Sequence, residues 1–88
     1  MAKNYKWEFN ETNENNEEIL HSVSLVCSML TGKAIITIDG DEYDISVKPF
    51  SLRGTNQVFR LGDLPAVIDF PKKGEPKLTV EGQVVDKL

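Results

Sequence analysis

The chain has 88 residues, of which 40% are hydrophobic, and its 10 basic and 14 acidic side chains give a formal net charge of −4. This length suits one domain over residues 1–88 and excludes two independent hydrophobic cores. The acidic balance opposes a general attraction to phosphate backbones or to anionic lipid, so we expect no nucleic acid and no membrane among the partners.

The first residues, "MAKNYKWEFN", are predicted to form a strand, and they lack the apolar centre of a signal peptide. Trp7 and Phe9 lie two residues apart in this strand and are expected to pack on the core. If Trp7 is exposed instead, it makes a good anchor in a partner interface.

A polar acidic loop is expected at residues 10–18, where Asn and Glu dominate and almost nothing can be buried. The simplest interpretation is a solvated loop between two strands. The alternative is that this acidic stretch attracts a basic partner.

Residues 16–30 contain the longest candidate helix, because helix formers follow an Asn cap. The second half of this stretch argues against a helix, since Val23, Leu25 and Cys27 alternate with Ser22, Ser24 and Val26. That period of two is typical of a strand, so we predict a strand from His21 to Ser28.

The lone cysteine, Cys27, excludes an intramolecular disulfide. Its apolar neighbours in "SLVCSML" indicate a buried thiol in a reducing compartment. No apolar run approaches the length of about 20 residues that spans a bilayer. These observations favour a cytoplasmic protein.

Short apolar runs separated by turn residues fill the rest of the chain. The expected strands, in chain order, are Lys33–Ile38, Glu42–Val47, Gln57–Leu61, "AVIDF" at 66–70, "KLTVE" at 77–81 and "QVVDKL" at 83–88. Strands this closely spaced, with no helix between them, predict an all-β fold: a single antiparallel β-sandwich of about seven to nine short strands.

The stretch "AIITIDGDEYDI", residues 34–45, admits two interpretations, an acidic metal loop or a β-hairpin. A two-residue turn at Asp39-Gly40 pairs Ile36 with Tyr43, sends the aliphatic side chains to one face and leaves most of the acids on the other. A calcium loop needs about six to eight converging oxygens, whereas the carboxylates of a hairpin diverge. We therefore predict a hairpin here, and no metal.

Residues that commonly perform catalysis are scarce. His21 and Cys27 are the one histidine and the one cysteine, and along a strand they lie about 20 Å apart, too far for a nucleophile and its base. Zinc needs more imidazole or thiolate ligands than the chain holds, and no Gly-rich phosphate loop is present. The sequence predicts no enzymatic activity and no cofactor, with a hydrolase built from carboxylates alone as the open alternative.

Arg53 and Arg60 bracket the stretch that ends at Phe59. Guanidinium groups next to an aromatic ring are a combination that binds single-stranded nucleic acids. The net negative charge favours the simpler interpretation, in which both arginines lie on the solvent face of a hairpin. Together with Trp7, these three are the candidate interaction residues.

Several landmarks follow one another in a recognisable order: Trp7 in a first strand, a strand led by His21, then "SMLTGKAIITIDG", "FSLRG" and "LTVEG". Over about residues 7–85 this order resembles one domain of the Fas apoptotic inhibitory molecule family. The resemblance implies an antiparallel β-sandwich and a role in interaction and in protection against cell death or protein aggregation, without enzymatic activity. The chain differs in having one domain where that family usually has two, and in its "NETNENNEE" insert.

Taken together, the absent catalytic residues and the resemblance predict a non-enzymatic module that binds a protein or peptide through an exposed sheet edge. An unpaired edge strand can also pair with its own copy, so self-association through an edge strand is an option. The alternative function is a β-sandwich that binds a small ligand or a carbohydrate. That function requires an exposed aromatic platform made by Tyr5, Trp7 or Tyr43.

Overall fold

The computed structural model describes residues 2–88, which form eight strands and no helix. The strands are β1 (Lys3–Thr12), β2 (Glu18–Cys27), β3 (Ala34–Ile38), β4 (Asp41–Asp44), β5 (Asn56–Leu61), β6 (Leu64–Asp69), β7 (Lys77–Val80) and β8 (Gln83–Val85). The expected all-β fold is confirmed, and the number of strands lies in the expected range. Nowhere in the described chain is there a helix long and apolar enough to cross a membrane.

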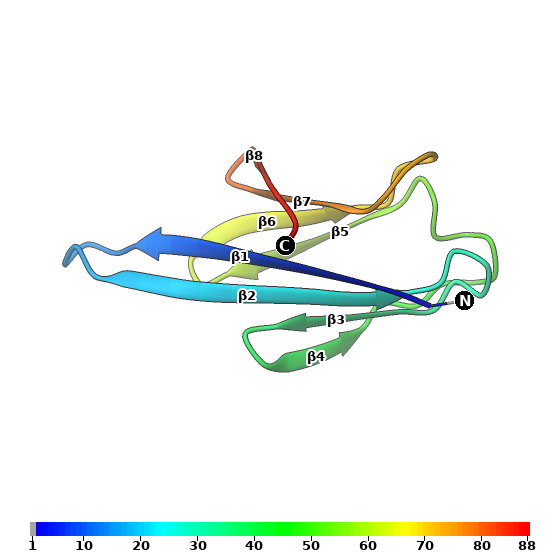
Figure 1. Cartoon of the computed structure of the whole chain (residues 1–88), viewed down its shortest axis with the longest axis horizontal. Helices are drawn as coiled ribbons and strands as arrows, with labels where there is room; N and C mark the ends of the chain where they lie inside the picture. The colour runs from blue at the N-terminus through cyan, green and yellow to red at the C-terminus, as the bar shows by residue number, and fades with distance from the viewer. Residues whose placement is uncertain (1) are drawn as a thin grey trace.

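Two antiparallel sheets of four strands each pack face to face (Figure 1). In each sheet every strand pairs with its neighbour in sequence, in the orders β1-β2-β3-β4 and β5-β6-β7-β8. The inner faces of both sheets contribute to one continuous core. Its largest fully buried side chains include Trp7, Leu25 and Ile36 from the first sheet and Ile68 and Leu78 from the second. The expected β-sandwich is therefore confirmed.

Strand β2 has one face in the core. His21, Val23, Leu25 and Cys27 are all buried, as a period of two predicts. The strand begins at Glu18, earlier than the predicted start at His21, because its backbone pairs with the full length of β1.

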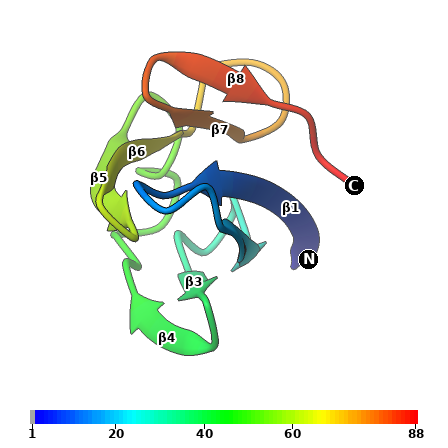
Figure 2. The same ribbon diagram turned by 90° about the vertical axis from the view of Figure 1, so that its left-hand side faces the viewer.

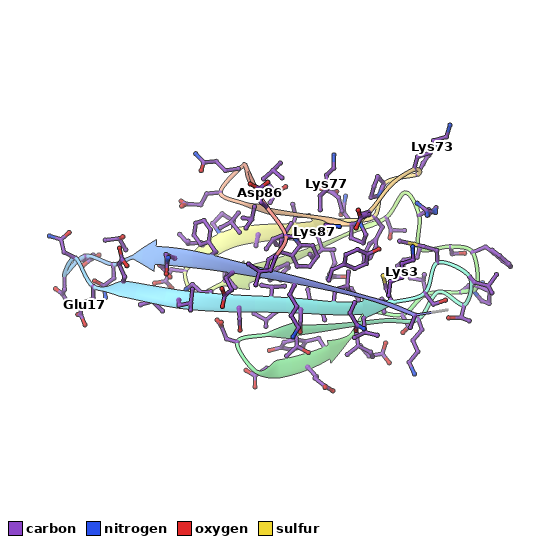
Figure 3. The ribbon with its side chains drawn as sticks, viewed as in Figure 1. Lys3, Glu17, Lys73, Lys77, Asp86 and Lys87 are labelled. Carbon is purple, nitrogen blue, oxygen red and sulfur yellow. The ribbon has the colours of Figure 1, made fainter. Side chains whose placement is uncertain are left out.

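The acidic loop is shorter than the predicted residues 10–18, since pairing of β1 with β2 continues to the pair Thr12 and Glu18. Backbone hydrogen bonds need no apolar side chain, so this polar stretch forms strand where it has nothing to bury. Asn13 closes the remaining loop, and its Oδ1 accepts hydrogen bonds from the N–H groups of Asn15 and Glu17 at 2.9 and 3.0 Å. Figure 3 shows Glu17 at the tip of this hairpin, beyond the other strands.

The hairpin at Asp39-Gly40 has the predicted register. Ile36 pairs with Tyr43, and the positive φ angles of Asp39 (49°) and Gly40 (91°) are those of a type I′ turn. Glu81 and Gly82 connect β7 to β8 in the same way, with φ angles of 50° and 80°. Among residues 2–88, no group of three or more His, Cys, Asp or Glu side chains is placed to hold a metal ion.

Strand β4 ends at Asp44, before the predicted end at Val47, and Ser46 is the reason. The hydroxyl Oγ of Ser46 accepts the N–H of Ala34 at 2.9 Å, where a regular strand would offer a backbone carbonyl. The N–H of Ser46 in turn donates to Oδ1 of Asp44 at 2.9 Å. Side-chain hydrogen bonds thus replace part of the ladder after Asp44, while the N–H groups of Ile45 and Val47 still donate to the backbone carbonyls of Ala34 and Gly32.

Candidate functional site

One long side of the sandwich, between β1 and β8, is partly closed by the end of the chain. Strand β8 ends at Val85, short of the predicted Leu88, because the following residues turn toward β1. The N–H of Leu88 donates to the carbonyl of Lys6 at 2.8 Å. The ammonium of Lys87, labelled in Figure 3, lies 5.6 Å from the centroid of the Tyr5 ring. These contacts cover part of the edge of β1, and beside them lies a hollow of about 730 Å³ that is lined by residues 3–6, Glu75, Lys87 and Leu88.

The opposite side, between β4 and β5, is open. Each of these strands is the last in its sheet and has one hydrogen-bonded neighbour. Figure 2, which looks along the strands, shows β4 and β5 on the same side of the molecule, away from β1 and from the end of the chain. An edge strand carries unpaired backbone N–H and C=O groups, to which another strand can bind.

Glu42 and Asp44 direct their backbone groups to the open side of β4. The N–H of Ile45 donates to the carbonyl of Ala34 at 2.9 Å. Because the direction of the backbone groups alternates along a strand, those of Asp41 and Tyr43 also face β3, and those of Glu42 and Asp44 face outward. Hydrogen bonds from the hydroxyl and the backbone N–H of Ser46 hold the pKa of the Asp44 carboxyl below its usual value. The free edge of β4 is therefore negatively charged at neutral pH.

Val58 and Arg60 direct their backbone groups to the open side of β5. The N–H of Phe70 donates to the carbonyl of Thr55 at 2.9 Å, in register with the β5–β6 ladder. Counting in twos from Thr55 leaves the backbones of Asn56, Val58 and Arg60 facing away from β6. The side chains of these three residues are exposed.

A groove of about 770 Å³ lies between the two free edges. Apolar side chains from both sheets line it, among them Ile38, Tyr43, Ile45, Val47, Val58 and Phe59. Tyr43 is 51% exposed and Val58 is 68% exposed, so both rims of the groove present apolar surface to solvent. The volume lies within the range of about 300–1,000 Å³ that is usual for ligand sites. Apolar walls next to unpaired backbone groups suit an extended peptide strand.

A buried histidine joins three other segments at one end of the sandwich. Nε2 of His21 lies 2.8 Å from Oε1 of Glu11 on β1, and its Nδ1 lies 2.7 Å from Oδ2 of Asp39 in the β3–β4 turn. The other carboxylate oxygen of Asp39 accepts the N–H of Ser22 at 2.8 Å. Gly62, in the β5–β6 turn, approaches so closely that a Cβ at this position would lie 3.0 Å from the imidazole.

Both ring nitrogens of His21 are engaged by carboxylates, so neither is free for acid–base chemistry on an external group. Desolvation lowers the pKa of His21, but the hydrogen bonds and charges of Glu11 and Asp39 outweigh it and raise this pKa above its usual 6.5. The imidazolium therefore links β1 and β2 to the turn that leads into β4. We interpret the cluster as a support for the open edge.

The free energy of unfolding is expected to fall as the pH rises above 6.5. Because the pKa of His21 is raised in the folded state, its stabilisation is complete below the unfolded-state value and is lost as the pH rises through the folded-state value. The useful pH range for this measurement is 6.5–9.0. Burial raises the pKa of the Cys27 thiol above 9.0, so the thiol titrates only beyond this range. Urea unfolding at several pH values in this range measures how steeply the free energy of unfolding falls with pH.

His21→Gln is the control for this pH dependence, since glutamine does not titrate. The variant is expected to be less stable than the wild type at pH 6.5 and to show no slope up to pH 9.0. A slope that survives in His21→Gln would mean that another group causes it.

The four candidate interaction residues lie in three different places. Phe59 and Arg60 both line the groove. Trp7 is 1% exposed and packs in the core, which was its expected position. Arg53 lies outside the groove, and its Nη1 donates to the carbonyls of Pro71, Lys72 and Gly74 at 3.2, 3.5 and 3.2 Å.

Val58 also lines the groove, although it was not among the predicted interaction residues. The sequence does hold a sign of this role. Val58 is an aliphatic residue at a solvent-facing position of its strand, between the polar Asn56 and Arg60 on the same face. Tyr43 was assigned to the core face, and its pairing with Ile36 agrees with that, but the absence of a further strand beside β4 leaves its ring half exposed.

Comparison with known proteins gives no relative: no protein-family model, no curated protein and no solved structure matches the chain. The resemblance to the Fas apoptotic inhibitory molecule family therefore stays a prediction. The geometry of the groove is the observation that bears on function.

Proposed function

We propose that this protein is a non-enzymatic interaction module that binds an extended segment of a partner protein between the free edges of β4 and β5. The observation that carries the proposal is the open side of the sandwich, where two unpaired edges flank an apolar groove. Strand addition uses both features, because backbone hydrogen bonds along the edge give affinity and alternate side chains enter the groove.

We also propose a cytoplasmic setting. Cys27 is a free, buried thiol, and burial raises its pKa. A thiol of this kind is unreactive and suits a reducing compartment.

A function in binding carbohydrates or small ligands has less support. Of the three residues expected to form its aromatic platform, Tyr5 and Trp7 are 9% and 1% exposed. Tyr43 is exposed, but a single ring does not make a platform. Strand addition also uses the unpaired backbone groups, which sugar binding leaves without a role.

Replacing Val58 with proline is expected to weaken partner binding by about tenfold or more, through the lost hydrogen bond and the bulk of the ring. The backbone of Val58 faces the open side and takes no part in the β5–β6 ladder, so proline removes a donor from the partner and none from the sheet. The measurement is capture from an extract of the cells that produce the protein, with bound proteins quantified by mass spectrometry.

Val84→Pro is the matched control, since Val84 lies on the other edge strand of the same sheet and is 64% exposed, against 68% for Val58. Its backbone also faces away from the ladder, because the pair that flanks the turn is Val80 and Gln83. Circular dichroism of both variants is the control for folding. Equal capture by the two variants, or no captured protein with the wild type, would contradict the proposed function.

A further inference from the structure

We propose that the strand that pairs with β4 is β5 of a second copy of this chain, so that two copies close each other's open side. The inference rests on the proposed function, because it uses the same two edges and the same groove. What it adds is the identity of the partner strand.

The side chains of β4 determine which strand can lie beside it. Glu42 and Asp44 project from the solvent face, so a basic residue opposite them is favoured and an acidic one is disfavoured. Tyr43 and Ile45 line the groove, so apolar residues are favoured opposite them. A second copy of β4 does not meet the first requirement, because it would place carboxylates opposite carboxylates.

Strand β5 meets both requirements. Arg60 lies on its solvent face and Phe59 and Leu61 on its inner face. Arg60 is exposed, and its Nη1 donates to the carbonyl of Asp63 at 3.4 Å. Within residues 2–88 its guanidinium forms no ion pair, so its charge is available to a carboxylate of another chain.

Antiparallel pairing of β4 with β5 of the second copy places Arg60 opposite a carboxylate in two registers. In the first, Arg60 lies opposite Glu42 and Phe59 opposite Tyr43, but the polar Gln57 lies opposite Ile45. In the second, shifted by two residues, Arg60 lies opposite Asp44, Leu61 opposite Tyr43 and Phe59 opposite Ile45, so this register meets both requirements. In both registers residues with outward-facing backbone groups meet one another, as a hydrogen-bonded ladder requires.

A twofold axis makes the same contact twice. Within one chain β4 and β5 run in opposite directions (Figure 1), so an axis parallel to the strands pairs β4 of each copy with β5 of the other, antiparallel in both cases. Each pairing joins a four-stranded sheet of one copy to a four-stranded sheet of the other. The dimer therefore covers both grooves and leaves no free edge on this side.

Charge reversal tests the dimer. One variant carries Glu42→Arg and Asp44→Arg, and the other carries Arg60→Glu. Each variant alone places like charges opposite one another at both contacts, which is expected to raise the dissociation constant of its dimer by about tenfold or more. An equimolar mixture is expected to restore association, because each variant then meets opposite charge at both contacts. Sedimentation equilibrium measures the masses, and native mass spectrometry identifies the mixed dimer.

Restored association in the mixture supports the inference, since a variant that had lost its fold could not be rescued by a folded partner. A wild-type chain that is monomeric at about 1 mM overturns it. A dimer that both variants leave unchanged also overturns it, because the contact then lies elsewhere. The capture experiment separates the two proposals. If the wild type is monomeric, or if its dimer is unchanged in both variants, but Val58→Pro loses partner capture while Val84→Pro keeps it, then the proposed function stands and only the identity of the partner is wrong.

Discussion

Replacing Gly32 with alanine is expected to destabilise the protein by about 2–5 kcal/mol, the sum of a left-handed backbone and an overpacked contact. Gly32 has a φ of +78°, a conformation that costs an L-residue about 1–2 kcal/mol. A Cβ would also overlap the backbone oxygens of Val47 and Lys48, which cannot rotate away as a side chain can. Urea unfolding followed by the fluorescence of Trp7 measures the loss.

This glycine matters for the groove because it holds the segment that follows β4. The N–H of Val47 donates to the carbonyl of Gly32 at 2.8 Å. Gly40→Ala is the control, since Gly40 has a φ of +91° and a Cβ there would have no atom within 4 Å. The free energy of unfolding of Gly40→Ala is expected to fall only by the backbone term, about 1–2 kcal/mol. Equal losses at the two glycines would contradict the close approach at Gly32.

Trp7→Ala is expected to reduce the free energy of unfolding by about 3–5 kcal/mol, the usual result of removing a large aromatic side chain from a core. Trp7 is 1% exposed and stacks with Tyr5, and their ring centroids are 6.2 Å apart. The truncation leaves a cavity between the two sheets. Circular dichroism during urea unfolding measures the change.

Partner binding is expected to survive truncation of Trp7 in the molecules that stay folded, since other residues line the groove. Trp7→Phe keeps an aromatic ring in the core and is expected to lose less stability, which makes it the better variant for the binding measurement. Binding by Trp7→Phe that is as weak as binding by Val58→Pro would place Trp7 in the interface and contradict the site.

Features that depend on neighbouring residues were predictable from the sequence. The alternation from His21 to Cys27 gave the buried face of β2 correctly, and the Asp39-Gly40 turn gave the register of β3 and β4. In each case a single local pattern carries the information, because a one-residue slip would bury the polar Ser22 and Ser24 of β2, or the charged Glu42 and Asp44 of β4.

Strand ends were less predictable, because side-chain hydrogen bonds determine them. Ser46 ends β4 early through its hydroxyl, and Asn13 confines the acidic loop to residues 13–17. Serine and asparagine compete with the backbone for such bonds, but composition does not say which of them will do so.

The site itself depends on how the two sheets are arranged. Strands β4 and β5 are consecutive in sequence and yet unpaired, and no periodicity shows which consecutive strands pair. Phe59 and Arg60 were predicted as interaction residues, but no local pattern in the sequence places them across a groove from Tyr43. The contacts of His21 were likewise hidden, since Glu11, Asp39 and Gly62 come from three other segments.

Hydrogen exchange of single backbone amides tests most directly whether β4 and β5 are edges that accept a strand. The amides of Glu42 and Val58 face the open side, and that of Val84 lies on the remote edge strand β8. In dilute protein all three are expected to exchange rapidly; with the partner strand bound, those of Glu42 and Val58 are expected to slow by about tenfold or more while that of Val84 is unchanged. Slowed exchange at Val84, with Glu42 and Val58 still exchanging rapidly in the bound state, would contradict the assignment of the binding edge.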